Sequence, residues 1–228
     1  MNTFFKGVRS MLPITAGVVP FGAVMGTVSA DANLTLFQTV TMNLFVFAGS
    51  AQLATVDLML KNTEAFVVIL TGIVINLRFI LYSAAISPVI QKSSLATKIF
   101  AAYFLTDQTY AVMSAKQSKF KTTKEVIEFY FGAAISMALV WHSSVLSGFI
   151  FGNFAPSTWA LDYAVPLSFV ALVAPTLKKT NYLIVAVASS ILSLLLINVP
   201  YNLGLIISSG LALMLGVGVS KKRAVRDR

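Results

Sequence analysis

Apolar residues run through almost the whole chain in stretches long enough to cross a bilayer, separated by short polar or charged connections. Because a helix needs ~20 residues to cross the hydrocarbon core, hydropathy and helix breakers predict about eight transmembrane helices. The chain is therefore expected to be an all-α, polytopic helical membrane protein. The expected spans are Val8–Val28, Leu36–Leu60, Ala65–Ser87, Leu95–Ala115, Val126–Phe151, Leu161–Leu177, Tyr182–Val199 and Asn202–Val219.

The second span carries small and polar residues at its centre, over Phe45–Leu53, where a simple anchor would have Leu, Ile and Val. In a bilayer, loosened helix is tolerated only where it faces protein or a water-filled cavity. The first span is also interrupted, by Pro13, Pro20 and several glycines. We therefore expect broken first and second spans to line a solute site near the midplane.

An inverted repeat is a further hypothesis. Val-Pro occurs in span one at Val19–Pro20 and in span six at Val165–Pro166, and Ala48–Ser50 in span two resembles Ala188–Ser190 in span seven. Interrupted segments at corresponding places of two inverted halves indicate a transporter site. The alternative is that such pairs recur by chance in apolar sequence.

Composition narrows the class of protein. The chain has 228 residues, of which 57% are hydrophobic and 11% charged, and a mean hydropathy of +0.83, which indicates one transmembrane domain over residues 1–228 rather than a soluble fold. No cysteine and only one histidine are present, so thiolate and multi-histidine metal sites are excluded. No phosphate-binding loop or nucleophile elbow occurs, and we expect neither enzymatic activity nor a cofactor.

The net charge of +9 is interpreted as topology rather than as a sign of nucleic-acid binding. With eight spans and both termini in the cytoplasm, most cations lie inside, including the basic tail at 220–228, while Lys92 and Lys98 lie outside. A seven-span arrangement would place the tail outside. The Lys116–Lys124 loop is expected to contact anionic lipid, and the N-terminal run is treated as span one rather than as a cleaved signal peptide.

Two opposite charges are expected inside the membrane. Arg78 follows Asn76 just past the middle of span three, and Asp107 lies near the centre of span four. An intramembrane charge indicates a functional site and needs a partner, and we expect these two to pair. The pair is either a structural salt bridge, or it exchanges partners with a zwitterionic solute or takes a proton.

Other polar residues in the spans have weaker functional readings. His142 titrates near neutral pH and is a candidate proton carrier, although a histidine bonded to a neighbouring hydroxyl or carbonyl is the commoner case. Gln52 and Asn43 fit interhelical hydrogen bonds, and Gln52 has the better claim to a solute. Asp57 lies close enough to a span end to reach water.

These motifs together resemble the AzlC family, the large subunits of bacterial branched-chain amino acid exporters. The resemblance runs from about Phe4 to Pro175. It departs from the family pattern where Phe79 follows Arg78 in place of a histidine. The motifs that carry it are Val19–Gly22, Phe47–Gln52, Asn76–Arg78, Leu81–Tyr82, Phe104–Asp107 and Trp141.

The resemblance implies export of valine, leucine, isoleucine and similar apolar amino acids across the bacterial cell membrane. It also implies a small AzlD-type membrane subunit as partner; a homo-oligomer is a further option. We expect coupling to the proton-motive force rather than to ATP. Two alternatives stay open: a structural subunit of a two-component membrane complex, or an exporter of another small amphipathic solute.

The expected site combines these residues. Amides at Gly49 and Ser50 bind the substrate carboxylate together with Arg78, as half-helix N-termini do in other transporters. Asp107 receives the ammonium group or a coupling proton. The remaining expected site residues are Gln52, Asn76 and His142, with Phe21, Phe45 and Phe47 enclosing the branched side chain.

Overall fold

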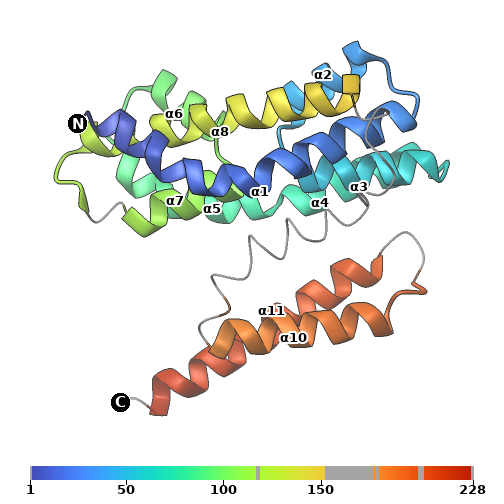
Figure 1. Cartoon of the computed structure of the whole chain (residues 1–228). Coiled ribbons are helices and arrows are strands. Elements are labelled where there is room, and N and C mark those ends of the chain that lie inside the picture. The colour runs from blue at the N-terminus through green and yellow to red at the C-terminus, as the bar shows by residue number, and fades with distance from the viewer. Residues whose placement is uncertain (1, 117–118, 152–176, 178–179, 200–202, 227–228) are drawn as a thin grey trace. The chain divides into compact units, whose positions relative to one another are not determined.

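The computed structural model describes residues 2–116, 119–151, 177, 180–199 and 203–226, which fall into two compact units, Met1–Ser168 and Phe169–Arg228. Each unit is described by itself (Figure 1). The described residues form helices joined by turns, without strands. This architecture and its apolar helices confirm the helical membrane fold.

Three helices among the described residues are long and apolar enough to cross a membrane. They are α1 (Thr3–Asp31), the continuous run Ala65–Ile90, and α8 (Thr123–Phe151). The middle run consists of α4 (Ala65–Asn76) and α5 (Arg78–Ile90). At the joint, the Leu77 amide donates to the Val74 carbonyl at 3.2 Å, a tighter turn than in an α-helix.

Glycines bring α1 and α8 into direct backbone contact. A Cβ at Gly132 would overlap the Phe4 carbonyl, and one at Gly148 would overlap the Ala23 carbonyl. Small residues of this kind let membrane helices approach closely. Because Phe4 lies against Gly132 and Ala23 against Gly148, the two helices run in the same direction.

The first span is one unbroken helix, contrary to the expectation from its prolines. Pro13 and Pro20 lie inside α1. Proline is tolerated in membrane helices where neighbouring groups satisfy the freed backbone. The extensive contact with α8 keeps α1 continuous on both sides of each proline.

The second expected span consists of two half-length helices, α2 (Leu36–Val46) and α3 (Gly49–Leu60), which have 11 and 12 residues. They are separated at Phe47 and Ala48, where Phe47 adopts left-handed backbone angles of φ 39° and ψ 43°. The expected break is therefore present, immediately before Gly49.

The fourth expected span is also interrupted. It consists of α6 (Leu95–Tyr103) and α7 (Asp107–Lys116), which have 9 and 10 residues. At 1.5 Å per residue each helix is only ~15 Å long, about half of the hydrocarbon core. Neither helix crosses the membrane alone.

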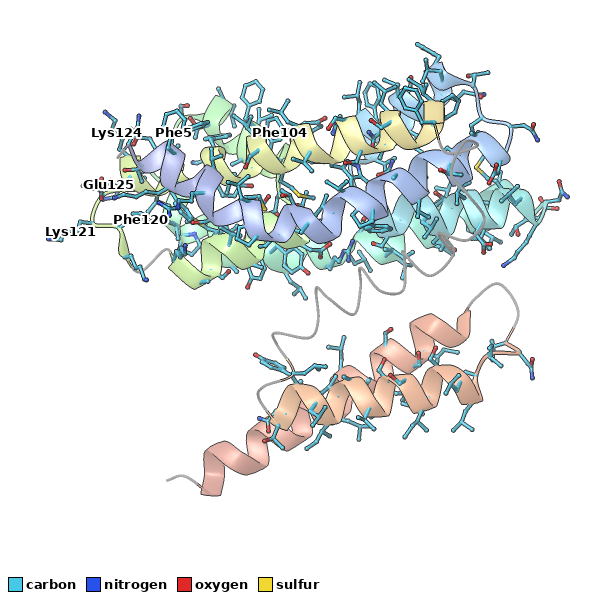
Figure 2. All side chains as sticks on the ribbon, in the orientation of Figure 1. Phe5, Phe104, Phe120, Lys121, Lys124 and Glu125 are labelled. Carbon is cyan, nitrogen blue, oxygen red and sulfur yellow. The ribbon has the colours of Figure 1, made fainter. Side chains whose placement is uncertain are left out.

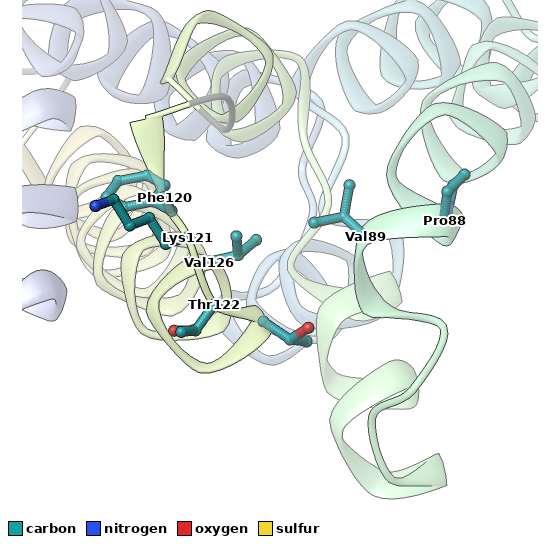
Figure 3. A pocket seen from close by; sticks show the side chains of 7 residues that line it. Pro88, Val89, Phe120, Lys121, Thr122 and Val126 are labelled. Atoms are coloured by element: carbon teal, nitrogen blue, oxygen red, sulfur yellow. The ribbon is translucent and has the colours of Figure 1, made fainter.

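Contacts at the ends show that α6 and α7 form a re-entrant hairpin. The end of α5 lies beside the start of α8, because Pro88 and Val89 line one pocket with Phe120 and Val126 (Figure 3). A short turn then leads into α6. At the other end of the hairpin, Lys116 Nζ donates to Ser10 Oγ at 2.7 Å, beside the start of α1. Both ends of this hairpin therefore lie at the end of the bundle where α1 and α8 begin.

The α2–α3 hairpin enters from the opposite end. It follows the end of α1 and precedes the start of α4, and both of these lie away from the start of α8. Figure 1 shows α2 and α3 at one end of the first unit and α6 and α7 at the other. The hairpin tips meet: Tyr103 Oη donates to the Leu44 carbonyl at 2.8 Å, and the rings of Phe47 and Tyr103 stack with centroids 5.9 Å apart.

This arrangement corrects two expected crossings, Leu36–Leu60 and Leu95–Ala115. It places Lys92 and Lys98 at the same end as most other cations of the first unit, and Lys61 at the opposite end. Figure 2 shows Lys121 and Lys124 near Phe5, at the start of α1. We call this end the basic end; its cations are Lys6, Arg9, Lys92, Lys98, Lys116, Lys119, Lys121 and Lys124.

An inverted arrangement is present, but in different segments from those expected. Helix α1 followed by α2–α3 has the opposite direction to α4–α5 followed by α6–α7. The expected counterpart Ala188–Ser190 lies inside one continuous helix, α10 (Thr180–Leu195). The other counterpart, Val165–Pro166, lies outside the described residues.

The second unit is an antiparallel helix pair. Helix α11 (Leu203–Arg226) returns along α10, since Gly204 lies against Leu196 and Gly216 against Val185. The basic segment from residue 220 is helical as far as Arg226, where α11 ends.

Large apolar side chains cover the outside of the first unit. Phe37 is 79% exposed, Phe66 74% and Leu81 69%. Such a surface is unfavourable in water but matches a bilayer, in which no hydrophobic force drives these side chains inward.

Candidate functional site

Three helices begin close to the point where the hairpin tips meet: α3 at Gly49, α5 at Arg78 and α7 at Asp107. The first turn of a helix carries unpaired amides and a partial positive charge. For α3 and α7, which start after a break in the helix, this places polar backbone in the middle of an otherwise apolar bundle, whereas α5 continues the run that begins with α4.

Arg78 connects all three helix starts. Its Nη2 lies 3.2 Å from Asp107 Oδ2 and donates to Ser50 Oγ at 2.6 Å. The Arg78 and Asp107 side chains are 27% and 21% exposed. The structure thus brings together Ser50, Arg78 and Asp107, which are far apart in the sequence.

Asp107 is held from two sides and by its own helix. Tyr82 Oη donates to Asp107 Oδ1 at 2.8 Å, and the Tyr82 ring stacks on Tyr110 with centroids 4.4 Å apart. Asp107 lies in the first turn of α7, where the helix dipole favours a negative charge. Thr106 caps this helix by accepting from the Thr109 amide at 3.2 Å.

A second, fully buried polar cluster lies behind the tip of the α2–α3 hairpin. Asn43 Oδ1 accepts from Trp141 Nε1 at 2.7 Å and from Gln52 Nε2 at 3.3 Å. Gln52 is 0% exposed. These bonds fix the hairpin to α8, which agrees with the interhelical reading of Asn43 and Gln52.

Gly49 is required by the packing of this cluster. A Cβ at Gly49 would lie 2.5 Å from Trp141 Cη2 and 3.1 Å from Phe21 Cε1. Ala48 precedes α3 and provides no side-chain cap. The first amides of α3 therefore have no side-chain cap, and glycine lets aromatic rings approach them closely.

Phe47 is enclosed by rings of the same chain. Its centroid lies 5.9 Å from Tyr103, 6.4 Å from Phe104 and 5.0 Å from His142. Phe45, in contrast, is 84% exposed. The expectation that Phe45 encloses a solute is therefore wrong, because the reversal of the chain after Val46 directs it outward.

Several buried polar atoms have no hydrogen-bond partner among the described residues. They include Gln52 Oε1, Asn76 Oδ1 and Arg78 Nε. Buried polar groups are usually paired with protein or with water. These atoms, which belong to residues on either side of two helix breaks, can accept or donate bonds to water or to a small polar ligand.

The remaining expected residues lie elsewhere. His142 contacts Phe47 rather than the charged pair, and Asp57 forms a surface ion pair with Lys61 at 2.7 Å. Sequence reasoning missed the part played by Tyr82, although its position one turn after Arg78 was a usable signal.

The pocket in Figure 3 is separate from these polar residues. It has a volume of about 400 Å³, lies at the basic end and is lined by Pro88, Val89, Phe120, Lys121, Thr122, Thr123 and Val126. Glu125 Oε2 accepts from the Lys121 and Thr122 amides at 3.0 and 3.2 Å. A carboxylate of the chain itself thus occupies the amides that could bind an anion there.

Opposed half-helices around an intramembrane ion pair are typical of transport proteins, and the described residues contain no acidic or histidine cluster that could hold a metal ion. The AzlC protein family model matches residues 13–155. The chain therefore belongs to the AzlC family, whose members are membrane proteins of the transport type rather than enzymes.

Curated relatives agree with this assignment. The inner membrane protein YgaZ of Escherichia coli K12 is 21% identical over 82% of this chain and 78% of its own length. An uncharacterized membrane protein of Helicobacter pylori 26695 is 22% identical over 79% of this chain and 80% of its own length. No solved structure shows a significant match.

Proposed function

We propose that the chain is the large subunit of a secondary transporter that exports branched-chain and similar apolar amino acids. The observation that supports this most is the Arg78–Asp107 ion pair, with N···O 3.2 Å, between the starts of half-helices. A cation and an anion at one place match the two charges of an amino acid.

The substrate carboxylate binds to Arg78 and to the uncapped amides of α3 at Gly49 and Ser50. The ammonium group binds to Asp107. Gln52 Oε1 and Asn76 Oδ1, which have no partner among the described residues, accept hydrogen bonds from the ammonium group or from water. Phe21 and Phe47 provide the apolar wall for the branched side chain.

The proposed function also includes the orientation of the chain in the membrane and the energy source of export. The basic end faces the cytoplasm of a bacterial cell, which the positive-inside rule supports, and the C-terminal tail is cytoplasmic too. Export is coupled to the proton-motive force, and Asp107 and His142 are the titratable candidates for the proton. A small AzlD-like membrane subunit completes the transporter. The two-subunit transporter functions as a single copy or as a homo-oligomer.

Valine efflux from proteoliposomes that contain the full chain and the small subunit tests this function. We expect Arg78→Ala and Asp107→Asn to abolish efflux, since each leaves one charge unpaired. Asp57→Asn is the matched control, because its carboxylate is 47% exposed and its ion-pair partner is Lys61. Normal efflux by both site variants would refute the proposal and favour a structural subunit.

A further inference from the structure

We infer that Tyr82 is a positioning residue that holds Asp107 for the ammonium group, so that the site selects solutes carrying both a carboxylate and an ammonium. This inference rests on the proposed function and adds a positioning residue to its site. Its basis is that the two oxygens of Asp107 have different partners, Tyr82 on Oδ1 and Arg78 on Oδ2.

The guanidinium of Arg78 is only partly used in this arrangement. Nη2 serves both Asp107 and Ser50, while Nε is buried without a partner among the described residues. Arginine binds carboxylates best through two parallel bonds. A substrate carboxylate that takes Nε and a neighbouring nitrogen would therefore compete well with the single contact to Asp107.

When Arg78 turns to the substrate, Asp107 Oδ2 loses its cation. Asp107 Oδ1 stays bonded to Tyr82, so the carboxylate keeps its place and offers Oδ2 to the ammonium group. No charge is left unpaired in the bundle in either state, whether Arg78 and Asp107 bind each other or each binds the substrate. A solute with one charge would leave Arg78 or Asp107 unpaired, which is strongly unfavourable in a low-dielectric site.

The ring of Tyr82 is held in a fixed direction. It stacks almost parallel on Tyr110, with an interplanar angle of 12°, and lies one turn after Arg78 on α5. The hydroxyl therefore approaches Asp107 from the same helix that carries the cation. Tyr82→Phe keeps the stack and removes only the hydroxyl.

The test is counterflow of labelled L-valine by the full chain with its small subunit in proteoliposomes. Two competitors share one carbon skeleton: unlabelled L-valine, and its oxo acid 3-methyl-2-oxobutanoate, which lacks the ammonium group. In the wild type, valine should compete far better than the oxo acid. Tyr82→Phe removes a hydrogen bond to a charged group, so it should weaken competition by valine about 10-fold and leave competition by the oxo acid unchanged.

Ser83→Ala is the control, because it removes one hydroxyl from an exposed position on the same helix. It should keep the wild-type preference for valine. The inference is overturned if Tyr82→Phe leaves the ratio of the two competitors as it is in the wild type. This includes a variant that weakens both competitors equally, as a folding defect would. Absence of counterflow in the wild type refutes the proposed function itself and the inference with it.

Discussion

Gly49→Ala is the smallest change that tests how the α2–α3 hairpin is held. The added Cβ would lie 2.5 Å from Trp141 Cη2, 2.9 Å from Cζ2 and 3.1 Å from Phe21 Cε1. Carbon atoms in contact are normally ~3.5–4.0 Å apart. The new methyl group therefore overlaps the indole by about 1 Å.

The indole has little freedom to move away. Trp141 is 3% exposed, its Nε1 donates to Asn43 Oδ1 at 2.7 Å, and its ring packs edge-on against Phe21 at 5.3 Å. Overpacking of this kind costs about 1–3 kcal/mol, while Ala in place of Gly within a helix gains up to ~1 kcal/mol. The net expectation is a loss of roughly 1–2 kcal/mol and a displaced start of α3.

Thermal unfolding in detergent and valine counterflow measure the two effects. At about 2–4 °C per kcal/mol, Gly49→Ala should melt several degrees below the wild type and transport more slowly. Trp141→Phe removes the overlapping atoms, so the double variant should recover part of the loss beyond additivity. Gly210→Ala is the control, since no atom of the described residues lies within 4 Å of a Cβ at that position. An unchanged Gly49→Ala protein, or no recovery in the double variant, would contradict this account.

Two further predictions concern the architecture. The chain has no cysteine, so single introduced cysteines can report topology. Cysteines at positions 92 and 116 should react with an impermeant maleimide from the same side of the membrane, and a cysteine at Lys61 from the other side. Labelling of 92 and 116 from opposite sides would restore the eight-span arrangement. Gly148→Ala should separate α1 from α8, because its Cβ meets the Ala23 carbonyl backbone rather than a side chain. Its melting temperature should fall more than that of Gly210→Ala, and equal melting temperatures would refute direct backbone packing.

The sequence was informative about residue types that are costly in a membrane. This cost makes Asp107 the candidate partner of Arg78, and small and polar residues near Gly49 predict a break in the second span. The actual break falls at Phe47, whose left-handed backbone is unusual for an aromatic residue. Contacts with Tyr103 and His142, distant in sequence, stabilise that conformation, so local patterns could not locate it.

The hairpins could not be read from hydropathy. Two half-helices of 11 and 12 residues have the same length and apolar content as one crossing, and only contacts at their ends reveal the reversal. The positions of the cations were informative. In the eight-span arrangement Lys92 and Lys98 lie outside, against the positive-inside rule, whereas with α6–α7 as a hairpin they lie at the basic end of the first unit. Within the first unit, the positive-inside rule therefore fits the observed fold better than the expected one.

The two hairpins are not equivalent, and their difference indicates how a substrate would be oriented. Helix α7 begins with its own carboxylate, Asp107, behind a threonine cap, so its positive end is already occupied. Helix α3 begins at Gly49, and the residue before it, Ala48, provides no side-chain cap. Arg78 lies between them and bonds to both starts, at Ser50 and Asp107. Under the proposed function, this difference favours a carboxylate on the α3 side and the ammonium group on the side where Tyr82 holds Asp107.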